Sequence, residues 1–208
     1  KTIFQGAENA PLIVCGSYGL SSKNTTPAQI VAVYDNLDSA EPKNGFTIGI
    51  VDDLSFKSLP VKEEISIVKP GTTECKFYGL GSDGTVGANK NTIKIIGDHT
   101  PKYAQGYFDY DSKKSGGYTC SHLRFGKEPI KAPYLVSTPD FVACHVPSYL
   151  EKYDVLKGIK DGGSLLLNSL WDEKETLERI PDHAKAVIGR KHINLYIMNA
   201  TKIAAEIG

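Results

Sequence analysis

The segment from Cys75 to Asn91 constrains the fold of this chain more than any other, because a predicted strand leads directly into a glycine-rich turn and a helix. Its sequence, CKFYGLGSDGTVGANKN, contains the glycine spacing GxGxxG. Glycines at these positions let the backbone turn tightly and approach a ligand, and the N–H groups at a helix N-terminus favour an anion such as a pyrophosphate. The pattern indicates either a nucleotide-like ligand or simple packing of a helix against a strand.

Predicted strands and helices alternate from about residue 65 onward. We expect strands over 74–80, 104–110, 117–124, 140–145, 164–168 and 194–199, and helices over 85–97, 148–159, 173–190 and from Thr201. Alternation of this kind predicts an open, mostly parallel, Rossmann-like α/β sheet with helices on both faces. The segment YFDYDSKKSGGYTCSHL instead predicts an antiparallel pair of strands that turns over residues 115–117.

The first 64 residues lack the alternation of strands and helices seen later in the chain, and they predict a strand, a helix and an extended arm. Strands are expected over Leu12–Gly16 and Phe46–Val51, followed by the polar, proline-containing segment DDLSFKSLPVKEE. Between the two expected strands, Thr26 is suited to cap a helix that has Pro27 at its first position. The apolar residues of this helix fall at helical spacing on one face and comprise Ile30, Val31, Tyr34 and Leu37.

The charge composition excludes a general attraction to nucleic acid or to anionic membranes, because 24 basic residues balance 24 acidic ones. No apolar run approaches the roughly 18 residues of a membrane span, and no signal-like leader is present. We therefore expect a cytoplasmic protein. The dispersed cysteines form no CxxC pair and have no histidine at metal-ligand spacing, so we predict no metal site and expect buried thiols at Cys15, Cys75, Cys120 and Cys144.

Acidic and basic groups follow the second strand of the expected nucleotide-binding unit. Dinucleotide sites place an acidic residue there for the ribose hydroxyls, or basic groups when the ribose carries a phosphate. Asp109 and Asp111 suit the first role, and Lys113 and Lys114 suit the second. Two ammonium groups beside a phosphate-binding turn favour coenzyme A or NADP. The alternative is that the lysine pair is simply solvated on a hairpin turn.

Two further side chains are candidates for ligand binding. Arg124, near the end of a strand, is placed either to clamp a phosphate or carboxylate or to tie down a neighbouring loop. Asn168 closes the strand LLLN at the carboxyl edge, where open α/β sheets bind their ligands.

Histidines near strand ends raise the question of catalysis. Ser121 and His122 are neighbours, but they point to opposite sides of a strand and no GxSxG elbow is present, so we predict no catalytic triad. Asp140 and His145 bracket another predicted strand. We assign no catalytic residue to this chain.

Three long strings, in this order and spacing, resemble the pyruvate:ferredoxin (flavodoxin) oxidoreductase family. They are GLGSDGTVGANKNTIKIIGD, AQGYFDYDSKKSGGYTCSHLRFG and the block from DFVACH to DGGSLLLNS. The resemblance covers residues 65–208 and is to the central gamma-type domain of that family, domain III. Residues 1–64 are similar to the end of the preceding domain and its linker arm. The family's full enzyme is expected to be a homodimer.

The resemblance implies an enzyme that oxidatively decarboxylates pyruvate with coenzyme A to acetyl-CoA and CO2. Electrons then pass from thiamine diphosphate, held through Mg, by way of [4Fe-4S] clusters to ferredoxin or flavodoxin. The gamma-type domain helps to hold coenzyme A and packs against the other domains. The cofactor-binding residues expected here are Gly79, Gly81, Ser82, Asp83, Gly84, Thr85, Val86, Lys113 and Lys114, with Arg124 and Asn168 as further candidates.

Some family features are absent from this sequence. It has neither a CxxCxxC cluster nor the GDG-to-Asn segment that holds thiamine diphosphate, so we expect those cofactors in other domains and no turnover of pyruvate by this part alone. Asn199 stands where the family pattern has aspartate, and we expect the domain to be truncated before a basic segment. The alternatives are a scaffold domain that binds no small molecule and, on the glycine motif alone, an NADP-binding oxidoreductase domain.

Overall fold

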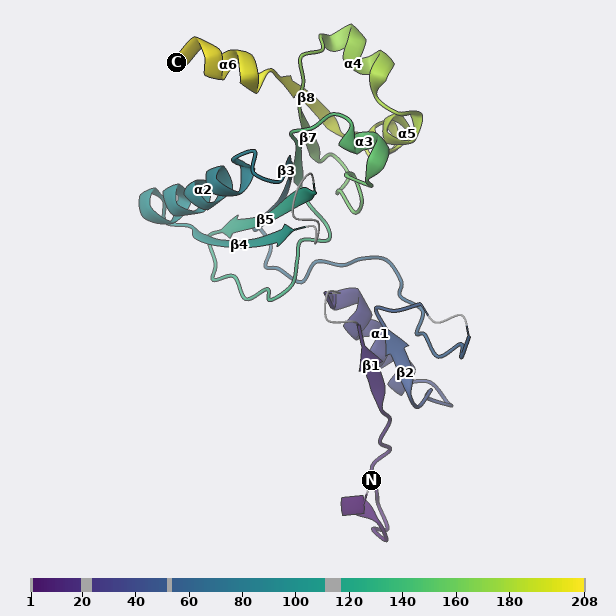
Figure 1. Cartoon of the computed structure of the whole chain (residues 1–208). Helices are drawn as coiled ribbons and strands as arrows, with labels where there is room; N and C mark the ends of the chain where they lie inside the picture. Colours follow the sequence, from purple (N-terminus) through teal and green to yellow (C-terminus); the bar gives the residue numbers. More distant parts are fainter. Residues whose placement is uncertain (1, 20–23, 52–53, 111–116, 208) are drawn as a thin grey trace. The chain divides into compact units, whose positions relative to one another are not determined.

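The structure is a computed structural model that describes residues 2–19, 24–51, 54–110 and 117–207. Its contacts divide the chain into two compact units, Lys1–Ile65 and Ser66–Gly208 (Figure 1). None of the helices in these ranges is both long and apolar enough to cross a bilayer.

The first unit is built on one short pair of parallel strands. A short 3-10 helix at Thr2–Phe4 comes first in the chain. Strand β1 (Gly16–Tyr18) then pairs with β2 (Phe46–Ile48), and helix α1 (Pro27–Leu37) connects the two strands in the sequence. The predicted cap of α1 is confirmed. The Thr26 hydroxyl accepts the Gln29 amide and the Gln29 side chain accepts the Thr26 amide, which together form a capping box.

The predicted bounds of the first strand are wrong. It begins at Gly16 and not at Leu12, and a Cβ at Gly16 would overlap the ring of Phe46. In α1 the larger apolar residues are exposed, with Tyr34 65% accessible, whereas Ala28 and Ala32 are buried. The short alanine side chains let the helix backbone approach the buried core, which contains Phe46, Ile48 and Leu59.

The second unit contains a six-stranded sheet in the order β4-β5-β3-β6-β7-β8. The strands are β3 (Thr73–Leu80), β4 (Tyr103–Tyr110), β5 (Tyr118–Gly126), β6 (Phe141–Cys144), β7 (Ser164–Asn168) and β8 (Asn194–Met198). Strands β3, β6, β7 and β8 are parallel, and β5 is antiparallel to both β3 and β4. Strand β5 is therefore the one reversed strand, which confirms the mostly parallel sheet and the antiparallel β4–β5 pair.

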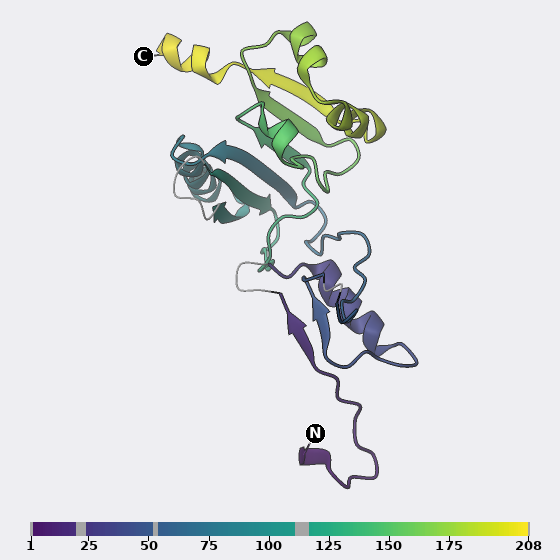
Figure 2. The same cartoon turned by 45° about the vertical axis from the view of Figure 1, so that its right-hand side comes forward.

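Helices cover both faces of this sheet, as predicted (Figure 1, Figure 2). Helix α2 (Thr85–His99) packs on β4, β5 and β3, and its Ile93 fills the space beside Gly106. The other helices are α3 (Tyr149–Lys152), α4 (Glu173–Arg179), α5 (Asp182–Arg190) and α6 (Ala200–Ile207). Side chains from α3 and α5 join the main core on the face opposite α2, together with Val142, Cys144, Leu165 and Leu167.

The helix predicted over residues 148–159 is mostly absent. Helix α3 ends at Lys152 because Tyr153 is extended, and the chain then turns through Gly158, which has a φ of 74°. Val155 and Ile159 reach the core from this irregular segment. Burial rather than helical periodicity explains their spacing.

The expectation of four buried thiols holds for three. Cys75, Cys120 and Cys144 are buried, whereas Cys15 is exposed. Burial raises the pKa of each of the three buried thiols to about 12. They are therefore protonated at neutral pH and act as small apolar side chains.

Candidate functional site

The glycine-rich turn lies at a topological switch point of the sheet. Strands β3 and β6 are parallel neighbours, but α2, which follows β3, covers one face and α3, which follows β6, packs on the other. Open α/β sheets bind ligands beyond the carboxyl ends of their strands at such a point. The chain reaches it through Leu80–Thr85 after β3 and through His145 after β6.

Backbone conformation explains two glycines of the motif. Gly84 caps α2 with a φ of 89°, in the left-handed region that favours glycine. Gly79 has no room for a side chain, because an added Cβ would overlap Thr85 and lie 2.7 Å from the Asp83 carboxylate. Ser82 also has a positive φ, of 72°, although it is not glycine. The turn is therefore tightly specified by its own packing.

Asp83 holds the turn together through its carboxylate. One oxygen accepts the Leu80 amide and the other accepts the Thr85 amide, both at 2.8 Å. A carboxylate at a helix N-terminus is also favoured by the helix dipole. Asp83 is thus a structural cap of α2 in this structure, and its negative charge lies where an anionic ligand would approach.

Other amides of the turn remain available to a ligand. Within residues 54–110 and 117–207, no acceptor takes the N–H groups of Ser82, Gly84, Val86 or Gly87. Ser82, Gly84 and Gly87 are exposed. These donors can bind phosphate oxygens, which is the chemistry that the glycine spacing predicts.

Replacing Gly79 with alanine should disrupt this turn. The new Cβ would displace Thr85 and Asp83, so we expect the free energy of unfolding to fall by about 1–3 kcal/mol in urea titrations followed by circular dichroism. Gly87→Ala is the matched control, because nothing lies within 4 Å of its added Cβ and alanine favours a helix. Equal stability of the two variants would contradict this packing argument.

A chain of hydrogen bonds joins the ends of the parallel strands. The Thr85 hydroxyl lies 2.8 Å from Nδ1 of His145, whose carbonyl accepts from the Asn168 side chain at 3.4 Å. The Asn168 side-chain oxygen in turn accepts the amide of Ala200, at the start of α6. The structure therefore brings the predicted residues Thr85 and Asn168 to one edge, with His145 between them.

Lys113 and Lys114, together with Asp111, lie outside the described residues. The described residues that flank them are at the same edge as the glycine turn, because Leu80 pairs with Tyr118 and Tyr110 pairs with Thr119. The Gly117 carbonyl also accepts the Gly81 amide at 2.9 Å. The described residues on either side of this segment, Tyr110 and Gly117, thus lie at the end of the sheet that carries the turn.

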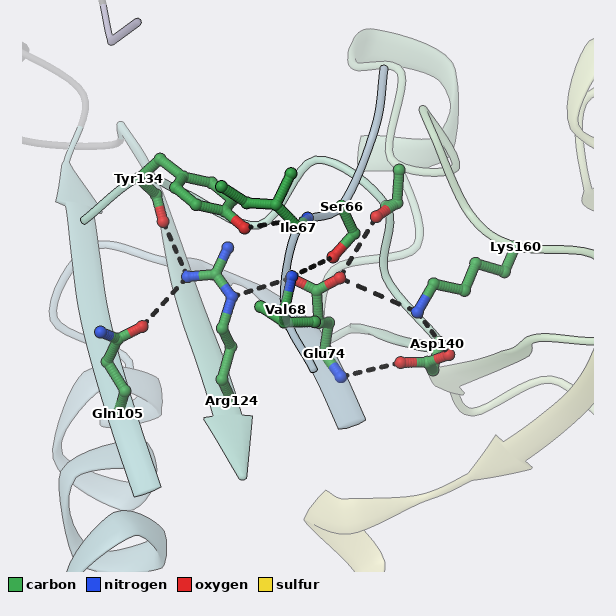
Figure 3. A network of polar contacts seen from close by, with 10 residues as sticks. Ser66, Ile67, Val68, Glu74, Gln105, Arg124, Tyr134, Asp140 and Lys160 are labelled. Carbon is green, nitrogen blue, oxygen red and sulfur yellow. Dashed lines mark hydrogen bonds and ion pairs between the residues drawn. The ribbon is translucent and has the colours of Figure 1, made fainter. Parts of the chain in front are cut away.

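Arg124 is not brought to this edge. It pairs in register with Glu74, five residues before Gly79, so it lies about 17 Å along the sheet from the turn. Its side chain is 1% exposed and forms an ion pair with Glu74 at 2.8 Å, as Figure 3 shows. Its Nη1 donates to Gln105 and to the Tyr134 carbonyl. The alternative of tying down a neighbouring loop describes Arg124 better than ligand binding.

Ser121 and His122 lie on opposite faces of β5. Ser121 faces the α2 side of β5, whereas His122 faces the opposite side with Arg124, in agreement with the strand alternation. Burial lowers the pKa of His122 to about 3, and Lys76 and Arg124 reinforce the shift. In the described ranges, no group of three or more His, Cys, Asp or Glu side chains is placed to hold a metal ion.

Sequence reasoning gave His145 no role, although it lies at the centre of the edge. A signal was present, because His145 directly follows the strand that pairs with β3. The order of strands in the sheet was needed to use it, and the sequence alone does not supply that order.

Comparisons with known proteins identify the family. Residues 74–208, more than half of the chain, match the model of the family described as pyruvate ferredoxin/flavodoxin oxidoreductase. The chain is 57% identical over 95% of its length to a pyruvate:ferredoxin oxidoreductase of Moorella thermoacetica. It is 52% identical over its whole length to a pyruvate-flavodoxin oxidoreductase of Klebsiella pneumoniae. The chain spans only 17% and 18% of these two relatives.

Among solved structures, the pyruvate oxidoreductase subunit PORC of Thermotoga maritima matches 65% of this chain and 66% of its own, with 20% identity and a TM-score of 0.49. The sequence relatives and the family model are the findings that decide membership. The chain belongs to the pyruvate ferredoxin/flavodoxin oxidoreductase family.

Proposed function

We propose that the chain is a segment of a cytoplasmic, homodimeric pyruvate:ferredoxin or pyruvate:flavodoxin oxidoreductase. The names of the relatives support this proposal, together with identities of 57% and 52%. The full enzyme would oxidise and decarboxylate pyruvate with coenzyme A, forming acetyl-CoA and CO2 and reducing ferredoxin or flavodoxin. Residues 65–208 would be its gamma-type domain, and residues 1–64 the end of the preceding domain with its linker.

Within that enzyme, the proposed role of this segment is to hold coenzyme A and to pack against other domains. The observation that carries the proposal is the set of amides at Ser82, Gly84, Val86 and Gly87, which lie at the switch point of the sheet and have no acceptor in the described part of the chain. Amides that converge at a helix N-terminus bind diphosphate oxygens. Asp83 opposes this binding electrostatically, so the free amides must outweigh one nearby carboxylate.

Lys113 and Lys114 are proposed to supply the compensating charge. Their segment is flanked by Tyr110 and Gly117, which lie at the edge that carries the turn. Asn168 is proposed to orient His145 and α6 at the same edge, and Arg124 is left out of the site. Thiamine diphosphate and the [4Fe-4S] clusters would belong to other domains, so this segment would not be catalytic alone.

Calorimetric titration of coenzyme A into the chain tests the lysines. Replacing both Lys113 and Lys114 with alanine should weaken binding by about 1.5–3 kcal/mol for each ammonium group that contacts a phosphate. The matched control removes two exposed lysines elsewhere, Lys157 and Lys174, at the same salt concentration. Equal affinity of the two double variants would rule out the proposed charge role.

A second candidate function is a scaffold domain that binds no small molecule by itself. Asp83 favours it, because an internal carboxylate already uses two amides of the turn. Absence of any heat or thermal shift with coenzyme A would support this candidate. Protection by NADP but not by coenzyme A would instead support the third reading, an NADP-binding domain.

A further inference from the structure

His145 is the side chain at the switch point that the proposed function leaves unused. It follows β6, and its backbone amide donates to the Tyr78 carbonyl at 2.9 Å, which fixes its position relative to β3. Its Nδ1 faces the Thr85 hydroxyl at 2.8 Å. In the described part of the chain its Nε2 has no partner, and this nitrogen is not among the buried unpartnered atoms. Nε2 is therefore open to a ligand.

The contact with Thr85 bears on which nitrogen carries the proton, and its geometry fits either direction of donation. No carboxylate or carbonyl in the described ranges accepts the Thr85 hydroxyl, and donation to Nδ1 of His145 gives that hydroxyl a protein acceptor, so this direction is the one assumed in the inference. A neutral imidazole with an accepting Nδ1 has its proton on Nε2. Burial lowers the pKa of His145, although the Asp83 carboxylate acts in the opposite direction. The ring is therefore neutral at physiological pH and presents an N–H group at the open side.

We infer that His145 is a ligand-binding residue whose Nε2–H donates a hydrogen bond to a phosphoryl oxygen, and that Thr85 positions it by fixing its tautomer. This inference rests on the proposed coenzyme A site. It adds a side-chain donor from β6 to the amides that follow β3, so that both strands of the switch point contact the diphosphate. Such a donor favours an acceptor-rich ligand and requires no positive charge on the ring.

The tautomer is measured in the ligand-free chain. Long-range proton–nitrogen correlation spectra of the 15N-labelled protein at pH 8 should show His145 protonated at Nε2 only. In Thr85→Val, which keeps the shape but removes the hydroxyl, the same spectra should show a mixture of the two neutral tautomers. A wild-type ring protonated at Nδ1, or at both nitrogens, would overturn the inference.

Binding of coenzyme A provides a second test with matched variants. Glutamine places an amide N–H near the position of Nε2, whereas asparagine reaches only the position of Nδ1. We therefore expect His145→Asn to weaken calorimetric binding by about tenfold or more, since it loses a hydrogen bond to a charged group. His145→Gln should stay within about threefold of the wild type, because it keeps the donor. His99→Asn, at the exposed end of α2, is the control.

The outcomes separate this inference from the proposed function. A wild-type chain that binds coenzyme A, together with a His145→Asn variant of equal affinity, would overturn the inference and leave the proposed function standing. A wild-type chain that does not bind coenzyme A would overturn the proposed function and, with it, the ligand assigned to His145.

Discussion

Replacing Arg124 with methionine is expected to lower the free energy of unfolding by about 3–5 kcal/mol, because the buried Glu74 carboxylate loses its guanidinium partner and keeps a more distant ammonium group, that of Lys160. Both Arg124 and Glu74 are 1% exposed, and their ion pair is 2.8 Å long. The guanidinium also lies over the ring of Tyr134, 4.6 Å from its centroid. Urea unfolding at pH 7.5, followed by circular dichroism, measures the loss.

The double variant Glu74→Leu, Arg124→Met is the control for this prediction. Replacing both charges with apolar groups removes the desolvation cost of an unpaired ion, so the double variant should be more stable than Arg124→Met alone. A double variant that lost at least the sum of the two single effects would contradict this account. The Lys160–Asp140 pair is 37% exposed on each side and is therefore weaker, but Lys160 also lies 3.8 Å from the Glu74 carboxylate and belongs to the same network.

Acidification should destabilise the second unit through His122. This histidine is 5% exposed, and its pKa is lowered to about 3, first by burial and then by Lys76 and Arg124. An unfolded histidine titrates near 6.5, so the unfolded state binds more protons between these values. The contribution of neutral His122 to the free energy of unfolding is therefore fully present above about pH 6.5. It is lost as the pH drops towards 3, by about 2–3 kcal/mol at pH 4.5.

The variant His122→Gln isolates this contribution because glutamine does not titrate. Its urea-derived stability should change less between pH 6.5 and 4.5 than that of the wild type, by about 1.4 kcal/mol per pH unit. His99→Gln, which removes an exposed histidine at the end of α2, is the control variant. If His122→Gln kept the full slope, the carboxylates and not His122 would be responsible for the acid sensitivity.

The sequence was sufficient to predict the strands of the second unit and their mostly parallel arrangement, because these strands carry strong local signals. Apolar runs such as LLLN and glycine turns fix strand positions, and strand β7 was predicted at its observed bounds, Ser164–Asn168. The glycine turn was predicted for the same reason, since its φ values and close packing require small residues. Local chemistry and global fold agree there.

The errors fall where tertiary packing overrides local pattern. In α1 the larger apolar residues share one face, as their spacing predicted, but the helix packs through Ala28 and Ala32. Arg124 was interpreted as a possible ligand clamp because its true partner depends on the register between β3 and β5. That register, which pairs Arg124 with Glu74, is not visible in a linear sequence. His145 was overlooked for the same reason, since only the β3–β6 pairing brings it to Thr85.

The reversed direction of β5 determines which part of the chain can vary next to the glycine turn. Because β5 runs antiparallel to β3, its first residue, Tyr118, pairs with Leu80 at the carboxyl end of β3. The connection between Tyr110 and Gly117 therefore joins the sheet at that end. If β5 were parallel to β3, this connection would join the sheet at the opposite end. Residues can be inserted or exchanged in that connection without altering the register of β3, β6 or β7. If the proposed coenzyme A site is correct, substitutions confined to residues 111–116 should alter ligand preference while the parallel strands stay unchanged.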